Sequence, residues 1–252
     1  MKVLLSPAKA LDMSREISPP ESSVPVFMLE SALLVKKMSQ FSSRKIGEMM
    51  SLSRELSELN YNRYQNWKSE VELNEENNYA VAAFNGEVYR GFDAESLSKV
   101  QMTIAQNKVR ILSGLYGILK PYDMIYPYRL EMGTKLAVTP KKTTLYKFWG
   151  TKIADSLNSE GDDTIVNLAS IEYFKAVGSK ALKAKVITPL FKELKKGEYK
   201  TVMVFAKRAR GRMARYIVEN DIEDAEELKG FDIDGYRFDE NLSSQFEWVF
   251  TR

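Results

Sequence analysis

The chain has 252 residues and a net charge of +3, from 37 basic and 34 acidic side chains. That length can bury one sizeable core or two small ones, and the near-balanced charge excludes a strongly basic tail or an acidic disordered protein. The chain has no cysteine and no histidine. Disulfides, thiol nucleophiles, thiolate zinc sites and Ser-His-Asp triads are therefore excluded, and a metal could be held only by oxygen ligands. We expect no cofactor and no metal.

The N-terminal apolar run covers only Val3, Leu4 and Leu5, which is too short for a signal peptide. No window approaches the ~20 apolar residues that a membrane span requires. We therefore expect a cytoplasmic monomer without a membrane partner.

The first part of the chain predicts a strand, a loop and a helical block. Residues 1–5 form a short apolar strand, and 6–26 form a loop that contains four prolines. Apolar residues at helical spacing predict three helices between Phe27 and Trp67, with Ser42 or Ser43 capping the second. We expect the helical block, at about 27–83, to be a subdomain.

The rest of the chain alternates irregularly between helices and strands. In chain order, the pattern predicts a helix over 74–83, a turn at Asn85-Gly86, a helix over 94–106, a strand over 109–112, an irregular segment over 116–128, a helix over 145–157, a strand over 164–168, a short helix over 170–177, a hairpin of strands 185–194 and 200–205, a helix over 209–219 and a closing pair of strands over 231–238 and 246–250. This alternation predicts an α/β fold, with an α+β mixed sheet and surrounding helices. Because no linker interrupts it, we expect one domain over 1–252.

The span 44–64 has the spacing of a helix-hairpin-helix element, with Ile46, Met49 and a hairpin at Ser51-Leu52-Ser53. Small hairpin residues let the backbone approach a phosphate, which the amides of the following helix then bind. Serines stand where the general motif has glycines, and serine resists left-handed backbone angles. The nearby cations are Arg44, Lys45, Arg54 and Arg63. The alternative is an ordinary helical hairpin that packs its apolar residues into the core.

A basic cluster follows the apolar run Val202–Phe205. It consists of Lys207, Arg208, Arg210, Arg212 and Arg215. If these residues open a helix, their charges oppose its macrodipole unless an anion is bound. We expect the cluster to lie at the rim of a cleft, not neutralised by the acids of 219–227. The alternative is a solvated face that pairs with those acids.

Two further segments carry groups that could bind a ligand. Ser6-Pro7-Ala8-Lys9 follows the first strand, so Lys9 could contact phosphate or act as a catalytic amine. Arg129 and Glu131 follow a loop whose tyrosines could stack bases or simply fill the core. The acidic run 221–227 favours a helix cap at Asp224 over a metal site.

The chain resembles the YaaA family of bacterial peroxide stress proteins. The segments that carry the resemblance are 5–9 with Leu11-Asp12, 84–89, 110–117, 127–134, 167–170, 172–174 and 205–211. The resemblance implies a single-domain α/β fold particular to the family, with a helix-hairpin-helix element and a positively charged cleft. It implies binding of double-stranded DNA, including branched or bulged forms, and a role in limiting free iron during peroxide stress.

The resemblance also implies where the site residues lie. The hairpin falls on Ser51, Leu52 and Ser53, flanked by Lys45 and Arg54. The cleft falls on Lys9, Arg129, Lys207, Arg208 and Arg210, and Arg212 belongs to the same basic cluster. Without histidine or cysteine the usual ferrous ligands are missing, so we expect an indirect effect on iron damage, such as protection of DNA.

Three functions from different classes remain open at this point. The leading hypothesis is a DNA-binding stress protein without catalytic activity. The second is an enzyme acting on a phosphorylated or nucleotide-like small molecule, in which Lys9, Arg129, Glu131 and Lys207 converge and Glu131 is the general acid/base. The third is an iron-binding protein with oxygen ligands.

Overall fold

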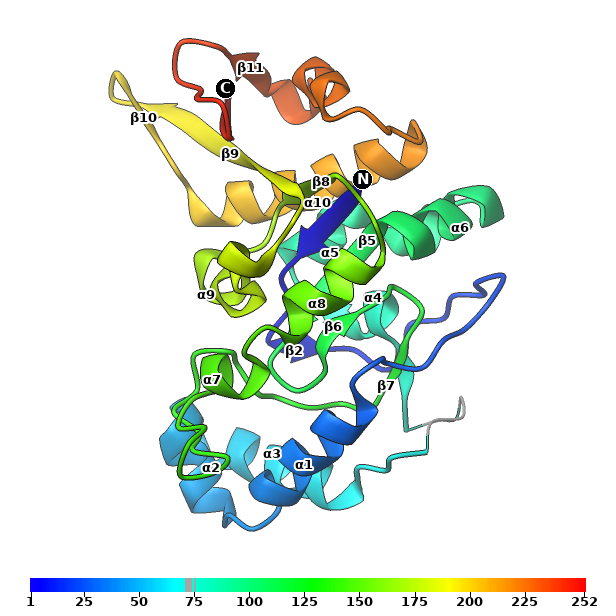
Figure 1. Cartoon of the computed structure of the whole chain (residues 1–252), viewed down its shortest axis with the longest axis vertical. Coiled ribbons are helices and arrows are strands. Elements are labelled where there is room, and N and C mark those ends of the chain that lie inside the picture. The colour runs from blue at the N-terminus through cyan, green and yellow to red at the C-terminus, as the bar shows by residue number, and fades with distance from the viewer. Residues whose placement is uncertain (71–73, 75) are drawn as a thin grey trace.

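The computed structural model describes residues 1–70, 74 and 76–252 (Figure 1). Its strands are β1 (Lys2–Leu5), β2 (Ala10–Leu11), β3 (Asn78–Tyr79), β4 (Phe84–Asn85), β5 (Val109–Ser113), β6 (Gly117–Leu119), β7 (Met124–Ile125), β8 (Thr164–Asn167), β9 (Lys185–Lys195), β10 (Glu198–Lys200), β11 (Arg237–Asp239) and β12 (Glu247–Thr251). Its α-helices are α1 (Met28–Met38), α2 (Ser43–Met50), α3 (Arg54–Asn66), α4 (Ala80–Ala83), α5 (Glu87–Phe92), α6 (Lys99–Lys108), α7 (Leu145–Trp149), α8 (Lys152–Ser159), α9 (Ile171–Phe174) and α10 (Met203–Glu219). Short 3-10 helices cover Ala94–Ser96, Lys175–Val177, Ser179–Ala181, Ala225–Gly230 and Ile233–Gly235.

The main sheet has the strand order β11-β12-β9-β8-β1-β5-β6, and β10 pairs with the far end of β9. The central strand β1 runs parallel to β5 and β8, with Val3 opposite Val109 and Val166. The edge strands β6 and β11 are antiparallel to their neighbours. Val3, Leu4 and Leu5 are fully buried, as expected for a parallel strand covered on both faces. The predicted mixed sheet with surrounding helices is therefore confirmed.

The helical block lies at one end of the long axis of the molecule. Figure 1 shows α1, α2 and α3 at the lower end and the β9–β10 hairpin and β11 at the upper end. One cluster of buried apolar side chains nevertheless includes Leu34 and Ile46 of this block together with Leu4 and Phe250 of the sheet. The single domain and the subdomain over 27–83 remain predictions.

Helix α10 packs closely on α5. An added Cβ at Gly211 would lie 1.9 Å from the carbonyl oxygen of Val88, and one at Gly91 would lie 2.3 Å from that of Arg208. The two backbones therefore touch, which only glycine permits. This crossing fixes the position of the basic residues that α10 carries.

Several predicted elements match the structure, including the strand over 109–112 and the capping roles of Ser42 and Asp224. The Ser42 hydroxyl accepts a hydrogen bond from the Lys45 amide at 3.3 Å. The Asp224 carboxylate accepts one from the Glu226 amide at 3.0 Å, at the start of a 3-10 helix rather than an α-helix. No helix in the described part of the chain is long and apolar enough to cross a bilayer.

The predicted helix over 74–83 was wrong for most of its length, and residue 75 lies outside the described residues. Asn78 and Tyr79 are extended because they pair with β7, and only Ala80–Ala83 is helical. The Asn78 side-chain amide donates to the carbonyl oxygens of Met13 and Arg15, which holds this segment against the N-terminal loop. Tertiary contacts here override the local helical pattern.

Other boundaries also differ. The helix over 145–157 is interrupted at Gly150, whose φ of 55° ends α7. The strand over 231–238 is reduced to β11, because Asp234 and Gly235 have positive φ angles. The segment 116–128 contains the short strands β6 and β7, and α5 follows Asn85-Gly86 where only a turn was predicted.

Candidate functional site

The predicted hairpin is a tight connection between α2 and α3. Ser51 adopts a left-handed conformation (φ 53°, ψ 50°), and the Leu52 amide donates to the carbonyl of Gly47 at 3.0 Å. The Ser53 hydroxyl caps α3 by accepting from the Leu56 amide at 3.3 Å. Leu52 is half-buried against the core. The structure thus contains a short helical hairpin at the predicted residues, and phosphate binding by it remains a prediction.

The cations beside the hairpin are locally balanced by acids. Arg44 pairs with Glu48 at 3.1 Å, and Arg54 pairs with Glu58 at 3.0 Å. Both arginine side chains are more than nine-tenths exposed. Exposed pairs of this kind contribute only about 0–1 kcal/mol, so a phosphate can displace the carboxylates.

We predict that Ser51→Gly stabilises the protein by about 1 kcal/mol, because a non-glycine residue pays a steric penalty in the left-handed region. It also restores the glycine of the general motif. The urea unfolding midpoint should rise. Ser51→Pro would lower it, since proline cannot adopt positive φ. An unfolding midpoint below that of the wild type for Ser51→Gly would contradict this assignment.

A groove of about 420 Å³ lies beside α2. Its lining residues are Lys37, Phe41, Lys45, Glu48, Met49, Lys135, Leu136 and Ala137. Of these, only Lys45 was predicted as a site residue. Sequence reasoning missed Lys37 and Lys135 because no sequence pattern connects the end of α1 with the loop after Gly133.

A second cluster joins Lys9, Arg129 and Glu131. The Glu131 carboxylate accepts from the Lys9 ammonium at 2.7 Å and from the Arg129 guanidinium at 3.1 Å. Lys9 is two-thirds exposed, whereas Arg129 and Glu131 are mostly buried. The structure thus brings together three of the four residues of the enzyme alternative. Lys207 is not among the residues that line this site, which are Pro7, Ala8, Lys9, Tyr128, Arg129, Leu130, Glu131 and Tyr173.

The cluster lies where strands β1 and β8 end. Ser6, directly after β1, accepts at Oγ from the Ser170 amide at 2.8 Å. The carboxyl ends of parallel strands are the usual place for a ligand in an open sheet. Burial raises the pKa of Tyr173, and the neighbouring Glu172 and Glu131 charges raise it further. Tyr173 therefore remains a phenol and can serve as a hydrogen-bond donor.

Helix α3 connects the hairpin with this cluster. The Tyr64 hydroxyl donates to the carbonyl of Arg129. Burial lowers the pKa of the Arg63 guanidinium, and the nearby charge of Arg129 lowers it further. Arg63 beside Arg129, and Lys9 on Glu131, thus add positive charge to this cluster.

The basic cluster of 207–215 lies within α10. The prediction that it opens a helix was wrong, because the residues 203–205, assigned to a strand, form the first turn of α10. The macrodipole argument therefore fails, since that effect is confined to the first turn. Arg215 pairs with Glu219 at 2.7 Å and with Asp93 at 3.4 Å.

The other four cations of α10 make no ion pair within the described part of the chain. Lys207 and Arg208 are exposed, and Arg210 and Arg212 are half-buried. Burial lowers the pKa of Arg210, and the buried Nε of Arg212 has no hydrogen-bond partner among the residues that the structure describes. The expectation that the acids of 219–227 do not neutralise this cluster holds for Arg208 and Arg210, which pair with none of the described acids, and is wrong for Arg215, which pairs with Glu219. Their position at a cleft rim remains a prediction.

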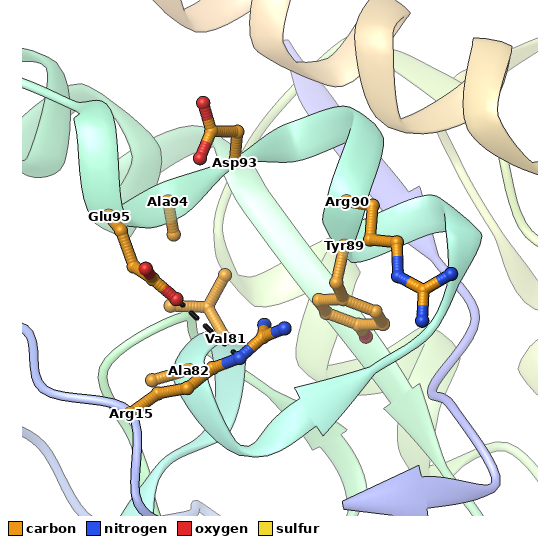
Figure 2. A pocket seen from close by; sticks show the side chains of 8 residues that line it. All are labelled: Arg15, Val81, Ala82, Tyr89, Arg90, Asp93, Ala94 and Glu95. Carbon is orange, nitrogen blue, oxygen red and sulfur yellow. Dashed lines mark ion pairs between the residues drawn. The ribbon is translucent and has the colours of Figure 1, made fainter. Parts of the chain in front are cut away.

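A further pocket of about 220 Å³ lies next to α5 (Figure 2). Figure 2 shows Arg15 facing Glu95, at 3.5 Å, on one side, and Arg90 on the other. Arg15 pairs with Glu95 and Arg90 pairs with Glu87, so each arginine of the pocket already has a carboxylate partner. Among the residues that the structure describes, no group of three or more acidic side chains could hold a metal ion.

Comparison with known proteins decides the family. The family model described as "Peroxide stress protein YaaA" matches residues 1–242. The chain belongs to this family. It is 47% identical over 257 residues to a UPF0246 protein of Hahella chejuensis, covering all of this chain and 99% of the relative. Similar UPF0246 proteins occur in Shewanella denitrificans (46% over 256 residues, 100% and 98% covered) and Caulobacter vibrioides (48% over 256 residues, 100% and 99% covered). The resemblance inferred from the motifs is therefore confirmed.

Proposed function

We propose that this peroxide stress protein binds double-stranded DNA in the cytoplasm without catalysing a reaction. The observation that carries this proposal is the set of cations on α10, Lys207, Arg208, Arg210 and Arg212, which lack carboxylate partners among the described residues. Uncompensated cations on one helix raise the local positive potential, although the chain as a whole is nearly neutral. A polyphosphate is the ligand that this potential attracts most strongly.

The hairpin provides a second set of contacts to the backbone. The amides in the first turn of α3 have no carbonyl acceptor within the helix. The Leu56 amide donates to the hydroxyl of Ser53 instead. These amides and the exposed side chains of Lys45 and Arg54 are suited to phosphate. Contacts of this kind carry no base information, so binding is largely independent of sequence.

The link to iron follows from the same binding. Iron bound along DNA converts peroxide into hydroxyl radicals, and a protein that covers the duplex limits the damage. Direct chelation is disfavoured, because the chain has no histidine or cysteine. We therefore propose indirect protection.

The test is fluorescence anisotropy on a labelled duplex across a salt series. If four to six phosphates are neutralised, log affinity should fall with log salt at a slope of roughly −4 to −5. Two duplexes of different sequence should give the same affinity. Binding that is absent, or insensitive to salt, would reject the proposal.

The second candidate function, an enzyme for a phosphorylated small molecule, is favoured by the contacts of Glu131 with Lys9 and Arg129 at 2.7 and 3.1 Å. The cavity between these residues is only about 10 Å³, so a nucleotide would lie over its mouth, on the exposed Lys9. It would raise the melting temperature of the wild type but not that of Lys9→Met. The same nucleotide would leave duplex binding unchanged, which separates the two functions.

A further inference from the structure

The groove beside α2 combines three parts of the chain that are distant in sequence. Lys37 and Phe41 come from the end of α1 and the residues after it, Lys45 and Met49 come from α2, and Lys135 comes from the loop after Gly133. Its volume of about 420 Å³ lies in the range of sites for small organic ligands. It is also next to the hairpin, because α2 carries Lys45 and ends at Met50, directly before Ser51.

The charge of this groove suits an anion. Lys37 and Lys135 make no ion pair within the described residues, and Lys45 lies 3.6 Å from Glu48. The lining of the groove thus carries three ammonium groups and one carboxylate. A chain of phosphodiesters can replace that carboxylate as the partner of Lys45 and can neutralise the other two lysines.

The floor of the groove is apolar. Leu136 is buried, and Phe41 and Met49 are half-buried against the core. The Lys37 ammonium lies 5.5 Å from the centre of the Phe41 ring. A duplex presents only its phosphates and groove edges, so an aromatic floor adds nothing to its binding. An unpaired base has an exposed face that can stack on such a ring, with its phosphates on the surrounding lysines.

We propose that this groove binds an unpaired nucleotide of a DNA strand, with the base on Phe41 and the phosphates on Lys37, Lys45 and Lys135. The inference rests on the proposed DNA binding and adds the class of DNA, a duplex continued by a single strand. The duplex lies on the hairpin, and the strand that leaves it enters the adjacent groove. A nucleotide that is already single-stranded does not have to be flipped out of a DNA duplex. The groove should therefore bind a nucleotide of a single-stranded tail more readily than a base-paired nucleotide.

The experiment compares three labelled DNAs by fluorescence anisotropy: a blunt duplex, the same duplex with a single-stranded tail of three thymidines, and one whose tail has the same phosphates but abasic sugars. The wild type should bind the thymidine tail roughly fivefold more tightly than the abasic tail, from the stacking of one base. The variant Phe41→Leu keeps every charge and leaves a smaller apolar side chain in place of the ring, so it should bind the blunt duplex as the wild type does. It should bind the thymidine tail and the abasic tail with equal affinity.

A second variant guards against a folding defect at Phe41. Lys135 is exposed, so Lys135→Glu should leave the melting temperature unchanged and weaken binding of both tails relative to the blunt duplex. Lys141→Glu, an exposed lysine further along the same loop, is the control and should not do so. Equal affinity for the thymidine and abasic tails, or a preference that survives in Phe41→Leu, would overturn the groove assignment alone. If none of the DNAs binds, the proposed function fails as well.

Discussion

Gly211→Ala should destabilise the protein by about 2–3 kcal/mol, although alanine is normally the better helix former by about 1 kcal/mol. The added Cβ would lie 1.9 Å from the Val88 carbonyl oxygen and 2.8 Å from the Phe92 amide nitrogen. Both are backbone atoms of α5 and cannot rotate away, so the two helices must separate. Separation exposes the buried stripe of α10, which includes Ala214 and Ile217. The measurement is urea unfolding followed by circular dichroism.

Gly230→Ala is the matched control for this change. An added Cβ there would meet only the Tyr216 hydroxyl at 3.5 Å, an ordinary van der Waals contact, and the backbone of Gly230 is not left-handed. Its free energy of unfolding should stay within about 0.5 kcal/mol of the wild type or rise slightly. If Gly211→Ala is as stable as Gly230→Ala, α5 and α10 are not in backbone contact.

The elements that were predicted correctly are those whose local pattern agrees with their tertiary surroundings. Val3, Leu4 and Leu5 are fully buried because β1 is covered on both faces of the sheet. The uninterrupted apolar run in the sequence indicates this burial correctly. The run Val202–Phe205 has a similar composition, yet Met203, Val204 and Phe205 are exposed at the start of α10. An apolar run indicates neither its secondary structure nor its burial when it is this short.

The residues of the candidate site were likewise predicted only where the local sequence carried the information. Lys9, Arg129 and Glu131 could be singled out because each follows a strand or loop that the sequence marks clearly, and they do meet. The left-handed angle of Ser51 was not expected of a serine, and the structure accommodates it at the turn between α2 and α3. Lys37 and Lys135 could not be found, because their proximity depends on how α1 packs beside the loop after Gly133. The unpartnered state of the α10 cations likewise depends on where the neighbouring acids lie.

The double variant Lys207→Glu with Arg208→Glu should weaken duplex binding at least about tenfold. Each phosphate contact contributes about 0.9 to the salt slope, so losing two should reduce its magnitude by about 2. Both side chains are exposed and make no ion pair among the described residues, so reversal of their charge leaves the packing of α10 intact. Arg210 and Arg212 are left unchanged because they are half-buried, and a carboxylate there would also affect folding.

The control for this variant must have the same net charge. Lys180→Glu with Lys183→Glu also changes two exposed lysines to acids, outside α10. At about 0.15 M salt the screening length is about 8 Å, so charges away from the interface contribute little to affinity. The control should therefore bind within about twofold of the wild type and keep its salt slope. If both double variants weaken binding equally, the protein responds to net charge alone and α10 is not the contact surface. If only the α10 variant changes affinity and slope, the phosphates lie against α10, and the hairpin variant Lys45→Glu with Arg54→Glu then measures what α2 and α3 add to the same interface.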